Sequence, residues 1–450
     1  MTRRFGAANA AIAIAATLLA GVLVACSTEA PPLRWPNVLL VTLDTTRADH
    51  LGCYGYGRNT SPALDAFAKG AVVFDLAYST SSWTLPAHAS LFTGRFPTSH
   101  GARFDADGPL LLSQAIPNDL LARAVRANPL AASDPTLAEL LRDAGYRTGA
   151  VVAGPWMKRI FGLDRGFDHY DDENIGSRAG RDGSEVSRRA IAFLDASTDT
   201  PFFLFLNYFD PHTPYTPPDE FRDLFVSEGE KAGAVALYDA EIRYMDQQLG
   251  RVFDHLEATG KADDTLVVVT ADHGELLGEH GRYRHGHTLF EEDIRVPLIL
   301  KFPRGELLPM RSDAPVQLTD VMPIVLGRLG LPGPEGIGRL ATRPQIFAEV
   351  YPLKAASNAG HWRVLRVGPF KLHLNSDGRH LLYNLDEDPH EEHNLATEQK
   401  VRLRAMASRL KRFQRQLPKP ERTPTHDPRE VGPETRRALE SLGYLPDDSP

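Results

Sequence analysis

The feature that most constrains the fold is a series of short, almost entirely apolar segments that alternate with amphipathic ones. Five apolar runs predict strands buried on both faces, at residues 37–43, 147–152, 202–208, 265–270 and 296–302. Four segments with apolar residues at helical spacing predict helices, at residues 61–69, 85–93, 136–144 and 234–256. Alternating strands and helices predict an α/β fold with a mostly parallel central sheet flanked by helices.

The pattern changes in the last third of the chain. Short alternating strands are predicted at residues 346–350, 362–367, 370–374 and 381–385, which indicates a small antiparallel subdomain. We therefore expect a main domain at 36–345, this C-terminal subdomain at 346–417, and a tail at 418–450 that is rich in proline and charge. Residues 103–134 are irregular, and a surface insertion is favoured there over a lid.

The N-terminus is typical of an export signal. Arg3 and Arg4 precede an apolar stretch at 8–20, which is short for a membrane span, so residues 1–25 are expected to be cleaved. The stretch that ends at Cys26 resembles a bacterial lipobox, with Cys26 lipidated and residues 26–35 as a tether. The alternative is an ordinary signal peptide with an incidental cysteine. We expect a membrane-anchored lipoprotein facing the periplasm or the cell exterior of a bacterium.

Charge and cysteine content argue against a nucleic-acid-binding protein and against a fold held by disulfides. The chain has 450 residues with a net charge of −8, and it shows no basic stripe, so a nucleic-acid partner is not expected. Of the two cysteines, only Cys53 would remain unmodified after lipidation, so no disulfide framework is possible within one chain.

Polar residues follow two of the predicted strands. Asp44 comes directly after the first strand, and Asp272 and His273 come just after the strand at 265–270. In parallel sheets ligands bind beyond the carboxyl ends of the strands, so these three side chains could hold a divalent metal. The histidine favours manganese or zinc over calcium. The alternative is that each aspartate only caps a turn or helix.

A second candidate feature lies at residues 82–94. Pro86 suits the first turn of a helix, so Thr84 is expected at the helix entrance, where free N–H groups stabilise an anion. His88 follows one turn later on the same face. A threonine hydroxyl bound to a metal can attack a tetrahedral sulfur or phosphorus centre. The alternative is that Thr84 is simply an N-cap.

Taken together, the chain from about Pro36 onward resembles the sulfatase family of the alkaline-phosphatase superfamily. The matching segments, in order, lie at residues 37–44, 84–94, 211–214, 270–275, 285–292, 295–298, 382–389 and 441–445. The resemblance implies that Asp44, Thr84, Asp272 and His273 bind one metal ion, with manganese, zinc, calcium and magnesium all open.

The resemblance also implies the catalytic roles. Thr84 falls at the position of the nucleophile, and His88 falls where an arginine normally steadies that nucleophile. His212 would contact the substrate oxygens or protonate the leaving group. His285 would bind the substrate anion or act as the acid, and His287 is either a second anion ligand or a loop residue without a role.

The departures from the family pattern bear on the substrate. Many sulfatases carry Cys/Ser-x-Pro-x-Arg and convert its first residue to formylglycine, whereas this chain has Thr84-Leu-Pro-Ala-His88, so no formylglycine is expected. Thr45 stands where a second aspartate is usual. A threonyl ester must be released by water, which is routine for phosphoryl groups and harder for sulfate.

The function predicted from sequence is therefore metal-dependent hydrolysis of sulfate or phosphate/phosphonate esters of small molecules or glycans, by in-line attack of Thr84. Two alternatives remain: a phospho-headgroup transferase acting on envelope glycans, and a catalytically inactive relative that binds glycans.

Overall fold

The computed structural model describes residues 35–105, 108–117, 125–176, 180–196, 200–226, 231–334, 345–351 and 360–420. The predicted signal peptide, the lipobox with Cys26, most of the tether and the motif at 441–445 lie outside the described residues. The described residues from Asn37 onward belong to one compact unit. Within the described part of the chain, no helix combines the length and apolarity needed to cross a membrane.

An eight-stranded sheet forms the centre, in the order β15-β2-β14-β10-β1-β9-β7-β8. Its strands are β1 (Asn37–Leu43), β2 (Val72–Phe74), β7 (Arg147–Val151), β8 (His169–Asp171), β9 (Phe202–Tyr208), β10 (Thr265–Thr270), β14 (Leu298–Lys301) and β15 (Met310–Ser312). All of its neighbouring pairs are parallel except those of β14, which runs antiparallel to β10 and to β2. The mostly parallel sheet predicted from sequence is confirmed.

The predicted strand at 296–302 is divided in the structure. Its first residue, Val296, belongs to β13 (Arg295–Val296), which pairs with β3 (Ala77–Tyr78) in a separate three-stranded sheet. Pro297 separates β13 from β14. Because proline has no backbone N–H to donate to a ladder, it is a suitable residue for the change from one sheet to the other.

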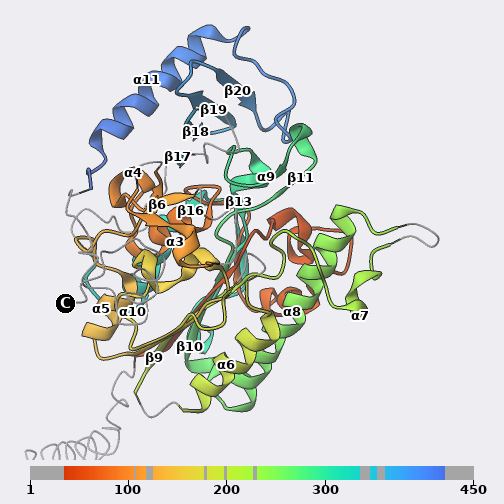
Figure 1. Cartoon of the computed structure of the whole chain (residues 1–450), viewed down its shortest axis with the longest axis vertical. Helices are drawn as coiled ribbons and strands as arrows, with labels where there is room; N and C mark the ends of the chain where they lie inside the picture. The colour runs from red at the N-terminus through yellow and green to blue at the C-terminus, as the bar shows by residue number, and fades with distance from the viewer. Residues whose placement is uncertain are drawn as a thin grey trace, which may run out of the picture. The chain divides into compact units, whose positions relative to one another are not determined.

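Helices cover both faces of the central sheet (Figure 1). One face packs against α2 (Pro62–Ala68), α6 (Gly183–Asp195) and α8 (Ala234–Ala258), and the other against α3 (Thr84–Thr93), α5 (Leu137–Asp143) and α10 (Val321–Leu329). Within β1, Val38 and Leu40 belong to the core on the α3 side, and Leu39 and Val41 to the core on the α8 side. Burial on both faces explains why the central strands are apolar at consecutive positions rather than at alternate ones.

The C-terminal sheet is antiparallel, as predicted. It consists of β17 (Ile346–Val350), β18 (Trp362–Val367), β19 (Phe370–Asn375) and β20 (His380–Asn384) in sequential order. One helix of this region, α11 (Lys400–Gln416), was not predicted. It packs Met406 and Leu410 into the core of the C-terminal sheet, and their spacing of four residues is the helical signal that the sequence contained.

The shorter elements complete the described structure. Residues 103–134 contain a small sheet of β4 (Arg103–Phe104), β6 (Arg126–Asn128) and β5 (Leu110–Leu111). The others are α4 (Pro97–His100), α7 (Asp219–Arg222), α9 (Glu291–Ile294), β11 (Leu276–Leu277), β12 (Tyr283–Arg284) and β16 (Val316–Gln317).

A buried ion network joins the C-terminal sheet to α9. The Lys371 ammonium lies 2.9 Å from a carboxylate oxygen of Glu291 and 2.9 Å from one of Glu391. His373 Nε2 lies 2.7 Å from the second oxygen of Glu391. Lys371 and Glu391 are almost completely buried. The charges of Lys371 and Glu391 are therefore compensated mainly within this network, by each other, by Glu291 and by His373.

Replacing Lys371 by methionine is expected to lower the free energy of unfolding by about 3–5 kcal/mol, because the buried Glu391 and the partly buried Glu291 lose their cation. Denaturant unfolding measures the change. The matched control is Lys400→Met at the exposed start of α11, which should change the free energy little. An equal, small effect for both variants would contradict a structural role for the network.

Candidate metal centre and active site

The neighbouring order of β10, β1 and β9 brings the predicted polar residues to one edge of the sheet. Asp44 directly follows β1, Asp272 lies two residues beyond β10, and His212 lies four residues beyond β9. The Asp44 N–H donates to the carbonyl of Tyr208 at 2.9 Å, which joins the ends of β1 and β9. The strand ends therefore converge as the sequence pattern predicts.

Two of these side chains, with the neighbouring His273, form a group that could hold a metal ion. Asp44, Asp272 and His273 are each fully buried, and they offer ligand atoms that lie within 4.8 Å of one another. Oδ1 of Asp272 accepts main-chain N–H groups from Thr45 at 3.2 Å and His273 at 2.9 Å. Oδ2 of Asp272 and both carboxylate oxygens of Asp44 are buried and have no hydrogen-bond partner among the described residues.

The histidine of this set has a defined tautomer. His273 Nδ1 lies 2.9 Å from the carbonyl oxygen of Gly274, which can only accept, so Nδ1 carries the proton. Nε2 is then an unprotonated ligand atom, 3.3 Å from Oδ2 of Asp272. Gly274 is required at this position, because a Cβ there would lie 2.0 Å from the carbonyl oxygen of Glu292.

The raised pKa values of the two carboxyl groups are consistent with a site that binds a cation. Burial raises the pKa of Asp44 well above its usual range, and the nearby Asp272 and Glu275 raise it further. Burial also raises the pKa of Asp272. Two unpartnered carboxylates and one imidazole nitrogen are a donor set for a divalent ion, whose charge removes the repulsion between them.

Thr84 is the first residue of the buried helix α3. The N-cap is Trp83, and no side chain caps this helix end, so the interpretation of Thr84 as an N-cap is wrong. Instead, Thr84 Oγ1 lies 3.3 Å from His273 Nε2. The hydroxyl therefore lies beside the ligand set, at a helix N-terminus that favours negative charge.

His88 holds the main chain of Thr84. Its Nδ1–H donates to the carbonyl of Thr84 at 2.9 Å, and its Nε2 lies 2.9 Å from the hydroxyl of Thr42. Nδ1 also lies 3.6 Å from Oδ2 of Asp272. Burial lowers the pKa of His88, so the ring is neutral and does not supply the positive charge of an arginine. In this geometry it positions Thr84.

Two further histidines lie next to His273. The ring centroid of His285 is 4.5 Å from that of His273 and 5.0 Å from that of His212. His212 Nδ1 donates to the carbonyl of Thr213 at 2.7 Å, which leaves Nε2 as an acceptor. Burial lowers the pKa of His212 and of His285 to about 3 in each case. Both rings are therefore neutral bases before substrate arrives.

His287 is separate from this group. Its Nδ1 is buried and has no hydrogen-bond partner within the described part of the chain. Burial lowers its pKa, and the charges of Arg282 and Arg284 lower it further. The ring is thus not held by loop contacts through Nδ1.

Two site residues were missed by sequence reasoning. Glu275 is fully buried, and its Oε1 accepts from His285 Nδ1 at 3.1 Å. Asn207 donates to the hydroxyl of Thr42 at 3.3 Å, and that hydroxyl in turn contacts His88. Asn207 could have been noticed as the one amide in the apolar strand 202–208, and Glu275 as the last residue of the matching segment 270–275.

The family model described as Sulfatase matches residues 36–331, which include every one of these ligands and histidines. The chain belongs to the sulfatase family. This sulfatase is 26% identical over 440 residues to the uncharacterized sulfatase YidJ of Escherichia coli K12, with 81% of this chain and 83% of YidJ covered. It is also 26% identical over 417 residues to the ulvan-active sulfatase of Formosa agariphila, with 80% and 77% covered.

Solved structures of the superfamily share the fold of this sulfatase. The phosphonate monoester hydrolase of Agrobacterium radiobacter superposes with a TM-score of 0.67 at 21% identity, covering 85% of this chain and 96% of that enzyme. The α/β architecture with a C-terminal antiparallel sheet is thus that of sulfatases and phosphonate hydrolases. As a member of the family, the chain is a hydrolase that acts on ester bonds.

Proposed function

We propose that this sulfatase-family hydrolase uses Thr84 as its nucleophile and cleaves phosphate or phosphonate esters in preference to sulfate esters. The observation that carries the proposal is the position of Thr84 Oγ1, 3.3 Å from His273 Nε2, beside three buried metal ligands. Similar proteins support both sulfate ester and phosphonate ester hydrolysis, since they include an ulvan-active sulfatase and a phosphonate monoester hydrolase.

The first step is attack by Thr84. Asp44, Asp272 and His273 would hold a divalent ion, which supplies Lewis-acid activation and positive charge for an anionic substrate. The N–H groups at the start of α3 face the same region and stabilise negative charge. His88 keeps Thr84 in place through its carbonyl oxygen. The proton that Thr84 loses is the one that the leaving oxygen needs, and His212 or His285 carries it.

The second step is attack by water on the threonyl ester. We assign His285 as the base that takes the proton of the attacking water and returns it to the Thr84 oxygen as the bond to that oxygen breaks, because Glu275 accepts its Nδ1–H at 3.1 Å and leaves Nε2 unprotonated. Glu275 is buried and therefore fixes both the tautomer and the orientation of the ring. Glu275 would therefore orient His285 in the same way as the aspartate of a catalytic triad orients its histidine.

Replacing Glu275 by glutamine is expected to lower kcat about a hundredfold, with the second step slowed more than the first. Rapid mixing with an aryl ester should then show one equivalent of aryl alcohol released before a slow steady state. Glu279→Gln is the matched control, because Glu279 lies in the same loop but pairs with Arg47 at 2.6 Å. Slowing without a burst would contradict the assignment to the water step.

Purified protein tested on matched aryl substrates decides the substrate class. The set is a sulfate ester, a phosphate monoester, a phosphodiester and a phosphonate monoester, each with manganese, zinc, calcium, magnesium or EDTA. We expect metal-dependent turnover of the phosphorus esters and little turnover of the sulfate. Clear preference for sulfate would overturn the proposal, and transfer to an added acceptor alcohol would reveal a transferase.

We also propose that the enzyme is exported and anchored by a lipid on Cys26, because the residues that precede Cys26 resemble a lipobox. Its substrates would then be esters of small molecules or glycans outside the cytoplasm. Cys26→Ser is expected to move the protein from the membrane fraction to the soluble extract. Retention of the variant in the membrane fraction would contradict the anchor.

A further inference from the structure

Three large apolar side chains are exposed together at the edge strand β15, and we call them the apolar cluster. Leu307, Leu308 and Met310 are 49%, 81% and 54% exposed. Elsewhere in the described part of the chain, exposed large apolar side chains occur singly along the sequence. Single exposed apolar residues are ordinary on a protein surface, whereas a group of them marks a surface that contacts another apolar one.

The apolar cluster lies at the amino-terminal ends of the parallel strands. Met310 pairs with Val72, the first residue of β2. Because β14 is antiparallel to both β2 and β10, β2 runs in the same direction as β10. Arg304, shortly before the apolar cluster, lies 2.8 Å from Asp264, which directly precedes β10. The metal ligand group lies beyond the other ends of these strands.

The chain that carries the proposed lipid enters the sheet at the same end. Asn37 is the first residue of β1 and pairs with Thr265, the first residue of β10. β1 and β15 are four places apart in the sheet order, which is a distance of about 20 Å. The chain from Cys26 to Asn37 can span at most about 40 Å. A membrane that holds a lipid on Cys26 is therefore within reach of the apolar cluster.

The groups beside the apolar cluster favour a lipid surface over a second copy of the chain. Arg304 pairs with Asp264, and Glu306 pairs with Arg328, so these charges are compensated within the protein. Unpaired charges would be costly to bring close to lipid chains. β15 itself is three residues long and follows Pro309, and both features discourage a second chain from adding a strand to this edge.

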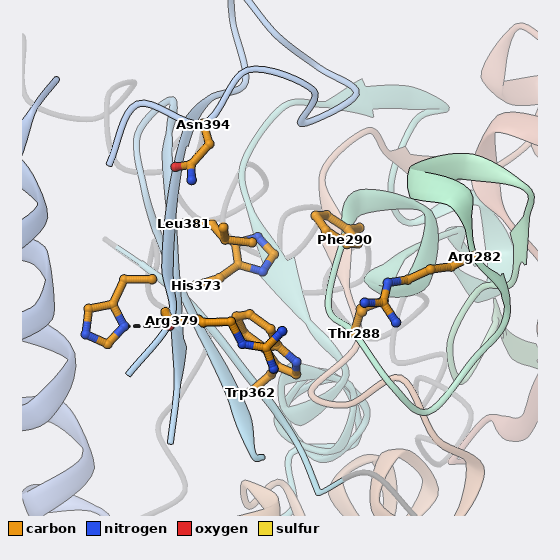
Figure 2. Close-up of a pocket in the computed structure, with 9 residues that line it drawn as sticks. Arg282, Thr288, Phe290, Trp362, His373, Arg379, Leu381 and Asn394 are labelled. Atoms are coloured by element: carbon orange, nitrogen blue, oxygen red, sulfur yellow. Dashed lines mark hydrogen bonds between the residues drawn. The ribbon is translucent and has the colours of Figure 1, made fainter. Parts of the chain in front are cut away.

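The other end of the strands presents a different surface. The segment 282–290 lies there, because its His285 is next to the metal ligand group. This segment forms one wall of a pocket of about 360 Å³, whose two large aromatic side chains, Phe290 and Trp362, are almost completely buried (Figure 2). Tyr283 is the one large apolar side chain of the segment that is exposed. Nothing in this segment corresponds to the apolar cluster.

We propose that the apolar cluster enters the surface of the phospholipid membrane to which Cys26 anchors the protein. The proposal rests on the proposed lipid anchor, which makes the second contact intramolecular, so that a few apolar side chains suffice to fix the orientation. β1 has seven residues, so the metal ligand group is then about 20 Å farther from the membrane than the apolar cluster. The active site receives water-soluble esters rather than lipids of that membrane.

Fluorescence quenching in the anchored protein tests the orientation. The protein is reconstituted in vesicles of phosphatidylethanolamine and phosphatidylglycerol that contain a nitroxide-labelled phospholipid. A fluorophore on Leu308→Cys should lose about half of its emission or more, because an interfacial side chain lies about 5–10 Å into the headgroup region. The same fluorophore on Tyr283→Cys should lose almost none. The unsubstituted protein corrects for any label on Cys53.

Vesicle binding by the unanchored Cys26→Ser protein tests the apolar cluster independently of the lipid. Adding Leu308→Asp should lower the partition coefficient into the same vesicles at least about tenfold, because a charge replaces an inserted apolar side chain. Val401→Asp is the matched control, since Val401 is 75% exposed on α11, and it should leave the partition coefficient unchanged. Both positions are exposed, so the unfolding temperature should not change.

Equal quenching at positions 308 and 283, or vesicle binding that Leu308→Asp does not weaken, would overturn the proposal. Self-association that Leu308→Asp abolishes, without vesicle binding, would also overturn it and would assign the apolar cluster to contact with a second copy of the chain. If Cys26 carries no lipid, the partition measurement still shows whether the apolar cluster enters a lipid surface, so failure of the anchor and failure of the docking are distinguishable.

Discussion

Replacing Thr84 by alanine is expected to lower kcat at least about ten-thousandfold, because a lost nucleophile removes the covalent route entirely. The hydroxyl makes no capping bond, so its removal should leave α3 and the unfolding temperature nearly unchanged. The metal content should also persist, since Asp44, Asp272 and His273 remain. Steady-state kinetics and elemental analysis of the same preparation measure both parts of the result.

Two variants sharpen this experiment. Thr84→Ser keeps a hydroxyl and should keep most of the activity that Thr84→Ala loses. Thr93→Ala removes a second buried threonine from the same helix, one whose hydroxyl donates to the carbonyl of Ala89 at 2.6 Å, and it should leave kcat nearly unchanged. Turnover by Thr84→Ala at the wild-type rate would show that water or another side chain attacks the ester directly.

Replacing Asp44 by asparagine should produce opposite changes in activity and in metal-free stability. Loss of a charged ligand should abolish stoichiometric metal binding and lower kcat/KM by about a thousandfold or more. The metal-free variant, however, should unfold a few degrees above metal-free wild type, because a buried charge that repels Asp272 and Glu275 is gone. Thermal unfolding with and without EDTA measures the change.

The pH dependence follows from the same repulsion. The pKa of Asp44 is raised in the folded state, and burial raises that of Glu275 to about 7. Folding therefore favours the protonated acids, so metal-free wild type should lose stability as pH rises from about 4 through these folded values. Asp44→Asn should reduce this slope, whereas Asn at the exposed Asp263 should not. An unchanged slope in Asp44→Asn would contradict the assignment of the repulsion to this site.

The sequence was sufficient for the central strands β1, β7, β9 and β10 and for the gathering of polar residues beyond the ends of β1, β9 and β10. Segments such as 202–208 are apolar at every position except Asn207 because both faces of the sheet are covered, and that pattern needs no knowledge of the tertiary structure. The order of β10, β1 and β9 then places Asp272, Asp44 and His212 at one edge. Parallel strands all present their carboxyl ends there, so the convergence of these residues could be predicted.

The contacts made by side chains across the site could not be predicted. His88 falls where an arginine normally steadies the nucleophile, but the sequence does not show that its ring contacts the Thr84 carbonyl and is held there by a hydrogen bond from Thr42 on β1. Glu275 becomes a partner of His285 only because the segment 276–284 returns the chain to the site through the hairpin of β11 and β12. Such pairings depend on loop paths, which periodicity does not encode.

Thr45, next to Asp44, combines a strained backbone with a buried hydroxyl. Its backbone has a φ of 55°, in the left-handed region, which costs about 1–3 kcal/mol for a β-branched residue. Its hydroxyl is buried without a partner among the described residues, and its N–H orients Asp272. Aspartate and asparagine tolerate this conformation better than threonine. A single substitution of Thr45 by aspartate would therefore relieve backbone strain and add a third carboxylate next to Asp44 and Asp272.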